Sequence, residues 1–450
     1  MAQVYNFGCR LNSYEGEVIR EQANKAGLDG ALIFNSCAVT AEAERQVKQA
    51  IRRARKENPE AKIIVTGCGA QIHPKDYAAM PEVDAVLGNE EKLKAASYLS
   101  LRGAEGDAAI QSGLLRYARN DDEKILVNDI MSVKETASHM VASFDGRARA
   151  FVQVQNGCNH RCTFCIIPYG RGNSRSVPMG EVVSQVRRLV EQGYHEIVLT
   201  GVDISDYGKD LPGEPTLGQM MRRLLALVPE LKRLRLSSID AVEVDDDLYR
   251  LIAEEPRLMP HLHVSLQAGD DMVLKRMKRR HLRHDIVAFA QKVRALRPDM
   301  VFGADIIAGF PTETDAMFDN TLRLVEELQL IHLHVFPYSA REGTPAAKMP
   351  QVAKSVRKER AAKLRAAGEK QLAHWLSAQV GKAASVVVEK PRLGRSEHFA
   401  MVELDKDCEA GSVIEVNVIS ATNSSLRGAL ATKQSSSQNP DCFTPLAMTR

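Results

Sequence analysis

Short apolar runs that alternate with helix-forming segments are the feature of this chain that most restricts its fold. Three such units occupy the first part of the chain, with runs and helical patterns at 3–8 and 13–26, at 31–36 and 41–57, and at 62–67 and after Pro74. Alternating strands and helices are typical of a parallel sheet covered by helices. The sequence therefore predicts an N-terminal parallel α/β domain over residues 1–105.

A cysteine follows each of these three predicted strands: Cys9, Cys37 and Cys68. The carboxyl ends of parallel strands meet at one edge of a sheet, so the three thiols are expected to converge there. A single cysteine at a strand end is more often a small buried residue than a ligand. Three cysteines at equivalent positions instead predict a shared metal site.

A second group of three cysteines, Cys158, Cys162 and Cys165, has the spacing C-x3-C-x2-C. Thiolates this close together can hold three corners of a cubic iron–sulfur cluster and leave the fourth iron open to a small molecule. Zinc is the alternative, but it usually takes four ligands, often from two separated cysteine pairs. His160 lies within the loop and would make a cramped fourth ligand.

The central part of the chain repeats the strand–helix unit six times. A polar linker is expected over 106–143, and strands are then predicted at 149–155, 196–202, 233–238, 261–267, 302–307 and 331–338. Six units predict an incomplete (βα)6 barrel over 144–375, with its chemistry at the C-terminal rim of the strands.

The pattern changes after a basic helix that begins at residue 355 and continues to about residue 376. Alternating runs at 384–389, 398–404 and 412–419 predict a small antiparallel β-barrel over 376–430. Residues 431–450 lack periodicity and are expected to be disordered. Cys408 and Cys442 have no neighbours suited to a cluster, so neither is expected to be a ligand.

Composition constrains the compartment and the partners. No apolar run in the 450 residues is long enough to cross a bilayer, and the N-terminus lacks the pattern of a signal peptide. A cytoplasmic protein with no membrane partner is expected, in which clustered cysteines favour metal binding over disulfides. The net charge of +3 does not by itself indicate nucleic acid. The basic runs 52–56 and 275–284 could grip phosphates or simply be solvated helix faces.

Both cysteine groups, in this order, resemble those of the radical S-adenosylmethionine (SAM) methylthiotransferases. The resemblance is carried by the stretches around Cys9, Cys37 and Cys68, by Ala43-Glu-Arg-Gln46, and by Phe164 before the last cysteine of the loop. It implies two [4Fe-4S] clusters as cofactors. Cys158, Cys162 and Cys165 would hold the one that binds SAM, and the first three cysteines would hold an auxiliary one.

Polar residues end several of the barrel strands: Thr200, Ser237, Ser238, Ser265, Gln267 and Asp305. They could be caps and turn residues, or they could hold SAM. Gly201 and Gly309 would let the backbone approach a ligand closely. The resemblance implies SAM contacts at Phe164, Gly201, Ser238 and Gln267. Asp240 stands where the family usually has Glu, so it is not among the predicted contacts.

Two histidine pairs, His261 with His263 and His332 with His334, have the period-two spacing that places each pair on one strand face. A metal site is one interpretation. Packing or hydrogen bonding inside the barrel is favoured, because the cysteines already supply two metal sites.

The resemblance is strongest to the branch that methylthiolates C2 of N6-threonylcarbamoyladenosine at position 37 of tRNA. Its expected partners are tRNA, a reduced flavodoxin or ferredoxin-type electron donor and a sulfur source, and its C-terminal barrel would be an RNA-binding TRAM domain. Three alternatives stay open. The isopentenyladenosine branch usually has an Arg-Glu pair after the second cysteine, which is absent here. The branch that modifies a ribosomal-protein aspartate usually reads Gly-Cys-Pro-Lys-Asn where this chain reads Gly8-Cys-Arg-Leu-Asn12. A non-enzymatic iron–sulfur protein that binds RNA is the third.

Overall fold

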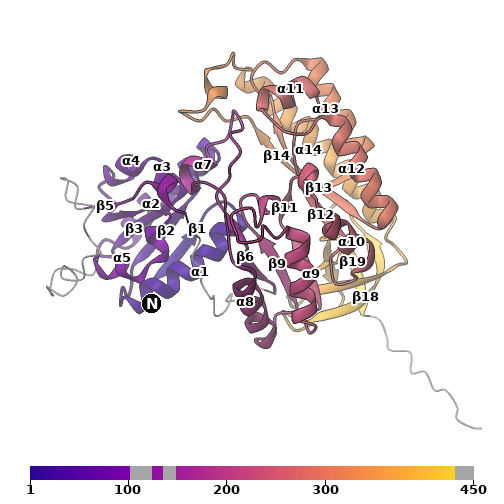
Figure 1. The fold of residues 1–450 in the computed structure, drawn as a ribbon, viewed down its shortest axis with the longest axis horizontal. Helices are drawn as coiled ribbons and strands as arrows, with labels where there is room; N and C mark the ends of the chain where they lie inside the picture. The colour runs from indigo at the N-terminus through magenta and orange to yellow at the C-terminus, as the bar shows by residue number, and fades with distance from the viewer. Residues whose placement is uncertain (102–123, 135–147, 431–450) are drawn as a thin grey trace, which may run out of the picture.

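The computed structural model describes residues 1–101, 124–134 and 148–430. Figure 1 shows an N-terminal α/β part in indigo, a central barrel in magenta to orange, and a small β-barrel in yellow. The end of the chain, 431–450, which is expected to be disordered, and most of the expected linker lie outside the described residues.

The N-terminal part is a five-stranded parallel sheet in sequential order, β1-β2-β3-β4-β5. Its strands are β1 (Gln3–Asn6), β2 (Leu32–Ser36), β3 (Ile63–Gly67), β4 (Ala85–Leu87) and β5 (Ile125–Leu126). Its helices are α1 (Arg10–Lys25), α2 (Ala41–Glu57), α3 (Cys68–Ile72), α4 (Pro74–Ala78) and α5 (Ala95–Leu99).

Helices cover both faces of this sheet because alternate strand residues point to opposite sides. Phe34 and Val65 pack in one core with Val47 of α2 and Tyr77 of α4. Their neighbours Ile33 and Ile64 pack in a second core with residues of α1 and α5. All the residues of β2 and β3 are buried, as expected for central strands of a parallel sheet.

Strand β5 shows that part of the expected linker belongs to the N-terminal sheet. Its residues, Ile125–Leu126, pair with Val86 and Leu87 of β4. With only two residues, β5 is too short to give a recognisable pattern in the sequence.

The central part contains six parallel strand positions. They are β6 (Ala150–Gln153), β9 (Glu196–Thr200), β10 (Arg233–Leu236) continued by β11 (Ser238–Ile239), β12 (His261–Gln267), β13 (Val301–Ala308) and β14 (Leu330–Pro337). The strands pair in the order β6-β9-β10 and β11-β12-β13-β14. Strands β6 and β14 are the two edges of the barrel. The predicted incomplete barrel is therefore confirmed.

Helices cover the outer surface of this barrel: α8 (Met179–Glu191), α9 (Leu217–Leu227), α10 (Asp246–Glu254), α11 (Asp271–Met277), α12 (Arg283–Leu296), α13 (Asp315–Glu327) and α14 (Lys354–Ser377). A short hairpin, β7 (Gln155–Asn156) with β8 (Arg175–Ser176), flanks the second cysteine group, and α7 (Ile167–Arg171) lies between its strands. Single 3-10 turns lie at η1 (Glu91–Leu93), η2 (Ile130–Ser132), η3 (Ile204–Asp206), η4 (Ala241–Glu243) and η5 (Pro345–Lys348).

The period-two geometry of the strands divides the barrel into an apolar outer layer and a polar interior. Val264 and Leu266 of β12, with Ala304 of β13, line a small apolar space shared with Phe289 of α12. The residues between them therefore face inward. These inward positions carry polar side chains, among them His261, His263, Ser265, Gln267 and Asp305.

The C-terminal part is a closed five-stranded barrel in the order β15-β16-β17-β19-β18. Its strands are β15 (Ala383–Lys390), β16 (Leu393–Ser396), β17 (Met401–Leu404), β18 (Val413–Ala421) and β19 (Leu426–Leu430). The sequence predicted three of them; β16 and β19 have only four and five residues. The barrel is antiparallel except where β17 and β19 pair in parallel, because β19 returns beside β17 after the β18 crossover.

Helix α14 joins the two barrels. Ala361 and Leu364 pack in the core of the central barrel, whereas Leu376 at the other end packs in the core of the small barrel. Among the described residues, no helix combines the length and the apolar character needed to span a membrane.

The loop between β16 and β17 places Phe399 against the inner side of the central barrel. Its ring stacks on His261 at 5.4 Å and lies under the guanidinium of Arg235 at 5.0 Å. Phe399 has a φ of 68°, a left-handed conformation that is uncommon outside glycine. The small barrel thus occupies the end of the central barrel at which its strands begin.

Glu196 at the start of β9 neutralises the arginines around this contact. Its carboxylate lies 2.9 Å from Arg235, 3.0 Å from Arg233 and 3.5 Å from Arg149. Burial alone would raise the pKa of Glu196, but these three arginines outweigh burial and lower it to about 2. The carboxylate therefore stays ionised within a cluster of buried cations.

We expect Glu196→Gln to lower the free energy of unfolding by about 3–5 kcal/mol, because it leaves three buried guanidinium groups without their shared anion. Urea unfolding followed by circular dichroism measures this loss. Glu57→Gln, which removes a half-exposed carboxylate from an ion pair within α2, is the matched control and should change stability by less than about 1 kcal/mol. Equal small losses in the two variants would contradict the role given to Glu196.

Candidate functional site

The loop of the second cysteine group is fixed at its start by Gln155. Its side-chain amide donates to the carbonyl of Gly157 at 2.7 Å and to Ser174 Oγ at 3.0 Å, while Oε1 accepts from the backbone of Asp203 at 2.8 Å. Gly157 has a φ of 74°, and a Cβ there would lie 1.9 Å from the carbonyl oxygen of Asn173. Only glycine fits this turn.

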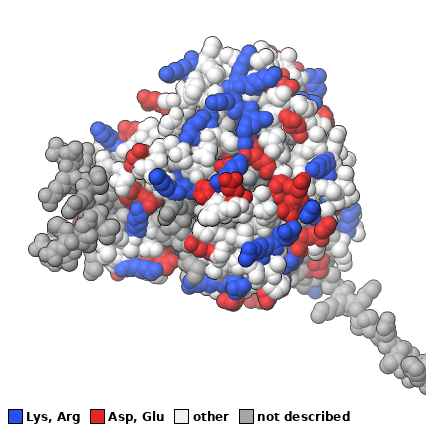
Figure 2. All heavy atoms as spheres, viewed as in Figure 1, with Lys and Arg blue, Asp and Glu red and all other residues white. Residues whose placement is uncertain are grey.

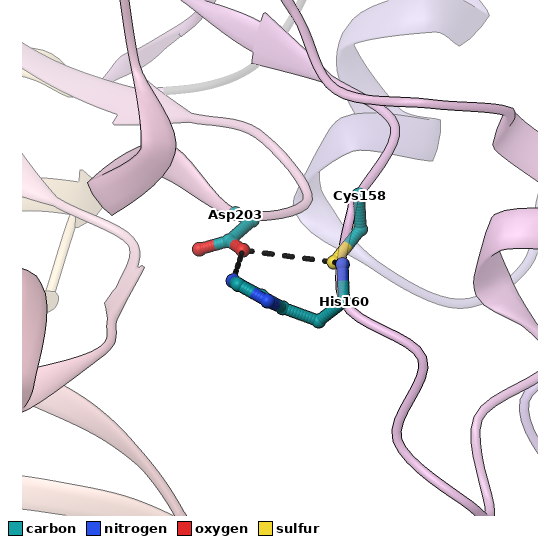
Figure 3. A group of neighbouring side chains, drawn as sticks. All are labelled: Cys158, His160 and Asp203. Atoms are coloured by element: carbon teal, nitrogen blue, oxygen red, sulfur yellow. Dashed lines mark hydrogen bonds and ion pairs between the residues drawn. The ribbon is translucent and has the colours of Figure 1, made fainter. Parts of the chain in front are cut away.

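The first cysteine of the loop meets an acid and a histidine (Figure 3). Cys158 Sγ lies 3.6 Å from Oδ2 of Asp203, and His160 Nε2 lies 2.9 Å from the same oxygen. Ligand atoms of these three residues all lie within 4.8 Å of one another, a geometry that could hold a metal ion. His160, considered above as a fourth zinc ligand, is thus turned toward Asp203, which follows the end of β9.

The other two cysteines have different surroundings. Arg279 Nη1 lies 3.7 Å from Cys162 Sγ, so a cation faces this thiol. Burial raises the pKa of Cys165 to about 12 and also raises the pKa of Cys158. In the absence of a metal these two thiols keep their protons, because a thiolate there would be poorly solvated.

Contacts with the far side of the barrel hold the middle of the loop. Thr163 donates its backbone N–H to the carbonyl of Met277 at the end of α11 and accepts from Ala346. The ring of Phe164 lies edge-on to Phe310, 6.4 Å between centroids. Phe164, a predicted SAM contact, is therefore held at the rim by packing with the segment that follows β13.

The first cysteine group lies at the carboxyl edge of the N-terminal sheet. Cys9 precedes α1, Cys37 follows β2 directly, and Cys68 begins α3 after β3. A Cβ at Gly8 would lie 2.8 Å from Cys37 Sγ, so the loop of the first cysteine passes directly over the second. Burial, followed by the nearby Cys68, raises the pKa of Cys37 to about 12.

The segments that carry the two cysteine groups meet where the N-terminal sheet contacts the barrel. Gly170 in α7 packs so closely on Cys68 that an added Cβ would lie 3.2 Å from the Cβ of Cys68. Asn89 donates to the carbonyl of Gly170 and lies 3.7 Å from Cys68 Sγ. Ile166, one residue after Cys165, shares an apolar cluster with Cys68. Segments that flank both groups therefore pack directly against each other.

A buried ion network holds this contact. Arg171 Nη1 donates to Glu15 Oε1 at 2.7 Å and Nη2 donates to Oε2 at 2.8 Å, and Lys92 Nζ lies 2.8 Å from the same carboxylate. Each of the three side chains is at most 2% exposed. Burial alone would raise the pKa of Glu15, but Arg171 and then Lys92 outweigh burial and lower it to about 2.

The predicted SAM contacts Gly201, Ser238 and Gln267 lie at or near the ends of the barrel strands. Gly201 and Gln267 lie at the rim: a Cβ on Gly201 would meet the carbonyl of Gln155 at 2.7 Å, and Gln267 ends β12 with a φ of 70°. Ser238 begins β11, half-buried. Asp240, which is not among the predicted contacts, forms ion pairs with Arg279 at 2.9 Å and Arg280 at 3.0 Å.

The histidine pairs are packed and hydrogen-bonded, as favoured from the sequence. His261 packs on His332 at 5.2 Å and on Phe399. His263 and His334 both bond to Oδ1 of Asp305, at 3.0 and 3.1 Å. Ligand atoms of His263, His334 and Asp305 all lie within 4.8 Å of one another, a geometry that could also hold a metal ion.

The basic run 275–284 is mostly paired within the protein. Arg279 and Arg280 bond to Asp240, and Arg283 bonds to Glu327. In 52–56, Arg53 pairs with Glu57 and Arg55 pairs with Asp84. Counting basic residues along the sequence therefore overstates the charge that these runs have free for phosphates.

Sequence reasoning missed Glu15, Arg171 and Asp203. Glu15 and Arg171 are separated by 156 positions, so no local pattern links them. Asp203 could have been predicted from the sequence. It follows Gly201 at the end of the second barrel strand, where an inward-facing acid is expected to reach the site.

Two family profiles match this chain. The profile of the Radical SAM superfamily covers residues 152–325, and that of Uncharacterized protein family UPF0004 covers residues 2–88. Among solved structures, the radical S-adenosylmethionine methyltransferase TsrM from Kitasatospora setae, with tryptophan and a SAM analogue bound, aligns with a TM-score of 0.50 and 15% identity over 73% of this chain and 66% of that chain. This likeness concerns the fold alone. The barrel and its cysteine loop define a radical SAM protein.

Relatives narrow this class. The chain is 55% identical to threonylcarbamoyladenosine tRNA methylthiotransferase MtaB of Rickettsia prowazekii, over 93% of this chain and 94% of that protein. It is 38% identical to MtaB of Thermotoga maritima over 86% of each, and 34% identical to tRNA-2-methylthio-N(6)-dimethylallyladenosine synthase of Novosphingobium aromaticivorans over 95% and 97%. The chain belongs to the MtaB family of radical SAM methylthiotransferases. The family predicted from the cysteine motifs is thus confirmed, as are its cofactors, SAM and [4Fe-4S] clusters.

We expect Glu15→Gln to destabilise the protein in a pH-dependent way. A folded-state pKa of about 2, below the ordinary 4.5, means that the charge of Glu15 stabilises the fold above pH 4.5 and that this contribution is lost as the pH falls toward 2. At pH 7 the variant should lose about 3 kcal/mol, with a smaller deficit at pH 3.5.

Urea unfolding of the metal-free protein at several pH values measures this difference. Glu21→Gln, in the same helix but paired with Lys25 at the surface, serves as the control. A deficit for Glu15→Gln that stays constant from pH 7 to pH 3 would contradict the ionised network.

Proposed function

We propose that this protein inserts a methylthio group at C2 of N6-threonylcarbamoyladenosine at position 37 of tRNA, using SAM and two [4Fe-4S] clusters. One observation carries the proposal: two groups of three cysteines, from two different domains, flank a single tightly packed contact, with Cys68 against Gly170. Radical SAM chemistry needs only one cluster with an open iron. A second thiol group at this contact suits a sulfur-inserting reaction, in which activated SAM and the sulfur must reach one substrate atom.

We assign the SAM-binding cluster to Cys158, Cys162 and Cys165, and the auxiliary cluster to Cys9, Cys37 and Cys68. When bound, the first cluster supplies the electron that cleaves SAM to a hydrogen-abstracting radical, and the second supplies the sulfur. The donor sets suit these groups. All six are thiols, which favour iron–sulfur clusters, and each set leaves one cluster corner without a cysteine.

The residues around the loop have separable tasks in this proposal. Arg279 offsets the negative charge that a thiolate at Cys162 would carry. Gln155 fixes the start of the loop relative to the end of β9. Phe164, held by Phe310, offers an apolar face to the adenine of SAM, while Gly201, Ser238 and Gln267 supply the remaining predicted SAM contacts from three strand ends.

An RNA substrate is supported by the surface beside this loop. Lys275 and Lys278 at the end of α11 are exposed, and Met277 between them bonds to Thr163 of the cysteine loop. Figure 2 shows Lys and Arg side chains gathered on the upper part of the face drawn there. Exposed cations next to the site suit the phosphates of an anticodon loop. The five-stranded C-terminal barrel would add a TRAM-like RNA contact.

The electron donor, the sulfur source and the compartment belong to the same proposal. A reduced flavodoxin or ferredoxin-type protein would supply electrons, and a separate sulfur source would rebuild the auxiliary cluster after turnover. A cytoplasmic location suits the protein, because thiols stay reduced there and the tRNA substrate is present there.

The dimethylallyladenosine substrate named for other relatives is the alternative. It is favoured less, because the identity to the Rickettsia MtaB protein is 55%, against 34% for the synthase of Novosphingobium aromaticivorans over a similar share of the chain. Nucleosides from a deletion strain distinguish the two by mass spectrometry. Loss of 2-methylthio-threonylcarbamoyladenosine is expected; its persistence, with loss of the dimethylallyl analogue, would overturn the choice of substrate.

We expect Cys37→Ala to abolish methylthiolation but to leave SAM cleavage measurable, because it removes a ligand of the auxiliary cluster only. Cys158→Ala should abolish both activities. The measurements are 5′-deoxyadenosine formation by the reduced, reconstituted protein and methylthio-nucleoside formation on RNA, with iron content determined for each variant.

Cys408→Ala is the matched control, since Cys408 lies in the small barrel, and it should retain both activities. If neither wild type nor Cys158→Ala forms 5′-deoxyadenosine and the two proteins behave alike, the radical SAM activity is refuted and the non-enzymatic alternative gains support.

A further inference from the structure

Arg10 occupies an unusual position, because it comes from the N-terminal domain but its guanidinium group lies inside the central barrel. It directly follows Cys9 at the start of α1. Its guanidinium carbon lies 5.5 Å from the centroid of the Phe399 ring. The charged groups that act on it electrostatically belong to the barrel interior and the small barrel: Arg235, Asp305, Glu196 and Arg395. Arg10 therefore links the first cysteine group to the polar interior of the barrel.

The arginines around Phe399 differ in their partners. Arg149 and Arg235 pair with Glu196, and Arg395 lies 3.3 Å from Glu389. Arg10 has no ion pair or side-chain hydrogen bond within the described parts of the chain. It is nevertheless only partly exposed. A cation withdrawn from water without an anion beside it is costly, and an anionic ligand would remove that cost.

The two acids near Arg10 already have other partners, so an additional anion would have a cation to bind. Glu196 is shared among three arginines. Asp305 is the other acid facing Arg10, and its Oδ1 already accepts from His263 and from the half-exposed His334. Neither acid forms an ion pair with Arg10 in the described parts of the chain.

We propose that Arg10 binds the carboxylate of the threonylcarbamoyl group of the substrate and thereby selects that nucleoside. The inference rests on the proposed function. A threonylcarbamoyl group ends in a carboxylate, whereas a dimethylallyl group carries no charge, so an unpaired arginine discriminates between them. The N6 substituent lies on the same edge of adenine as C2. A carboxylate bound by Arg10 would therefore keep C2 close to Cys9, the neighbouring residue of the first cysteine group.

The test uses anticodon stem–loop RNA that carries threonylcarbamoyladenosine, either as the free acid or as its methyl ester. The ester keeps the size of the group but removes its charge. Wild type, Arg10→Met, Arg10→Lys and the control Lys25→Met, which removes an exposed cation from the last turn of the same helix, are compared as reconstituted full-length proteins. Iron content and RNA-independent 5′-deoxyadenosine formation establish that each variant keeps its clusters and cleaves SAM.

Wild type and Lys25→Met should prefer the acid over the ester by about 10- to 100-fold in kcat/KM, the range expected for a hydrogen bond to a charged group. Arg10→Met should lower kcat/KM for the acid by a similar factor, leave the ester unchanged and so lose the preference. Arg10→Lys should keep part of it, because lysine retains the charge but not the two-pronged geometry.

Two results would overturn the inference while leaving the proposed function intact: wild type that acts equally on acid and ester, or an Arg10→Met variant that keeps the acid preference. The first needs no variant, so it decides the matter even if Arg10→Met loses its auxiliary cluster. Wild type that cleaves SAM with both clusters present but methylthiolates neither RNA would overturn the proposed function, and the role of Arg10 with it.

Discussion

The contact between Glu15 and Arg171 determines how the two halves of the site face each other. Glu15 lies in α1, which starts directly after Cys9, and Arg171 ends α7, which follows Cys165 closely. Both oxygens of the carboxylate bond to the guanidinium, at 2.7 and 2.8 Å. Such a two-pronged pair has one preferred orientation, whereas apolar surfaces can slide past each other. The network therefore fixes the relative position of two cysteine groups that belong to separate domains.

A second charged network, around Glu196, fixes the opposite end of the barrel. Arg149 bonds to both Glu196 and Glu389, and Glu389 lies in the small C-terminal barrel. Both domain contacts of the central barrel thus depend on buried ions with shared carboxylates. Burying such groups is expensive, and a buried pair adds little stability over apolar packing. Its physical advantage here is geometric, since substrate, SAM and sulfur must meet within bonding distance.

The sequence predicted those parts of the fold that local patterns encode. Strand–helix alternation gave the sheet and the six barrel strands, and α2 has the predicted bounds. Strands β5, β16 and β19, with two, four and five residues, were missed. Cysteine spacing identified both thiol groups. The residues that bring them together, Glu15, Lys92 and Arg171, lie far apart in the chain and have ordinary local sequences, so only the folded structure reveals their contact.

The polar interior of the barrel follows from the same alternation and explains how an open barrel can serve a large substrate. A complete (βα)8 barrel fills its centre with apolar side chains. Here the inward positions of β12 and β13 carry His263, Gln267 and Asp305, while the outward positions carry the apolar core. Phe399 of the small barrel closes the end where the strands begin. A polar interior that is covered at that end and carries buried arginines suits the charged nucleoside of the proposed reaction, which would enter from the rim. In that proposal the C-terminal barrel closes the substrate site in addition to any contact that it makes with RNA.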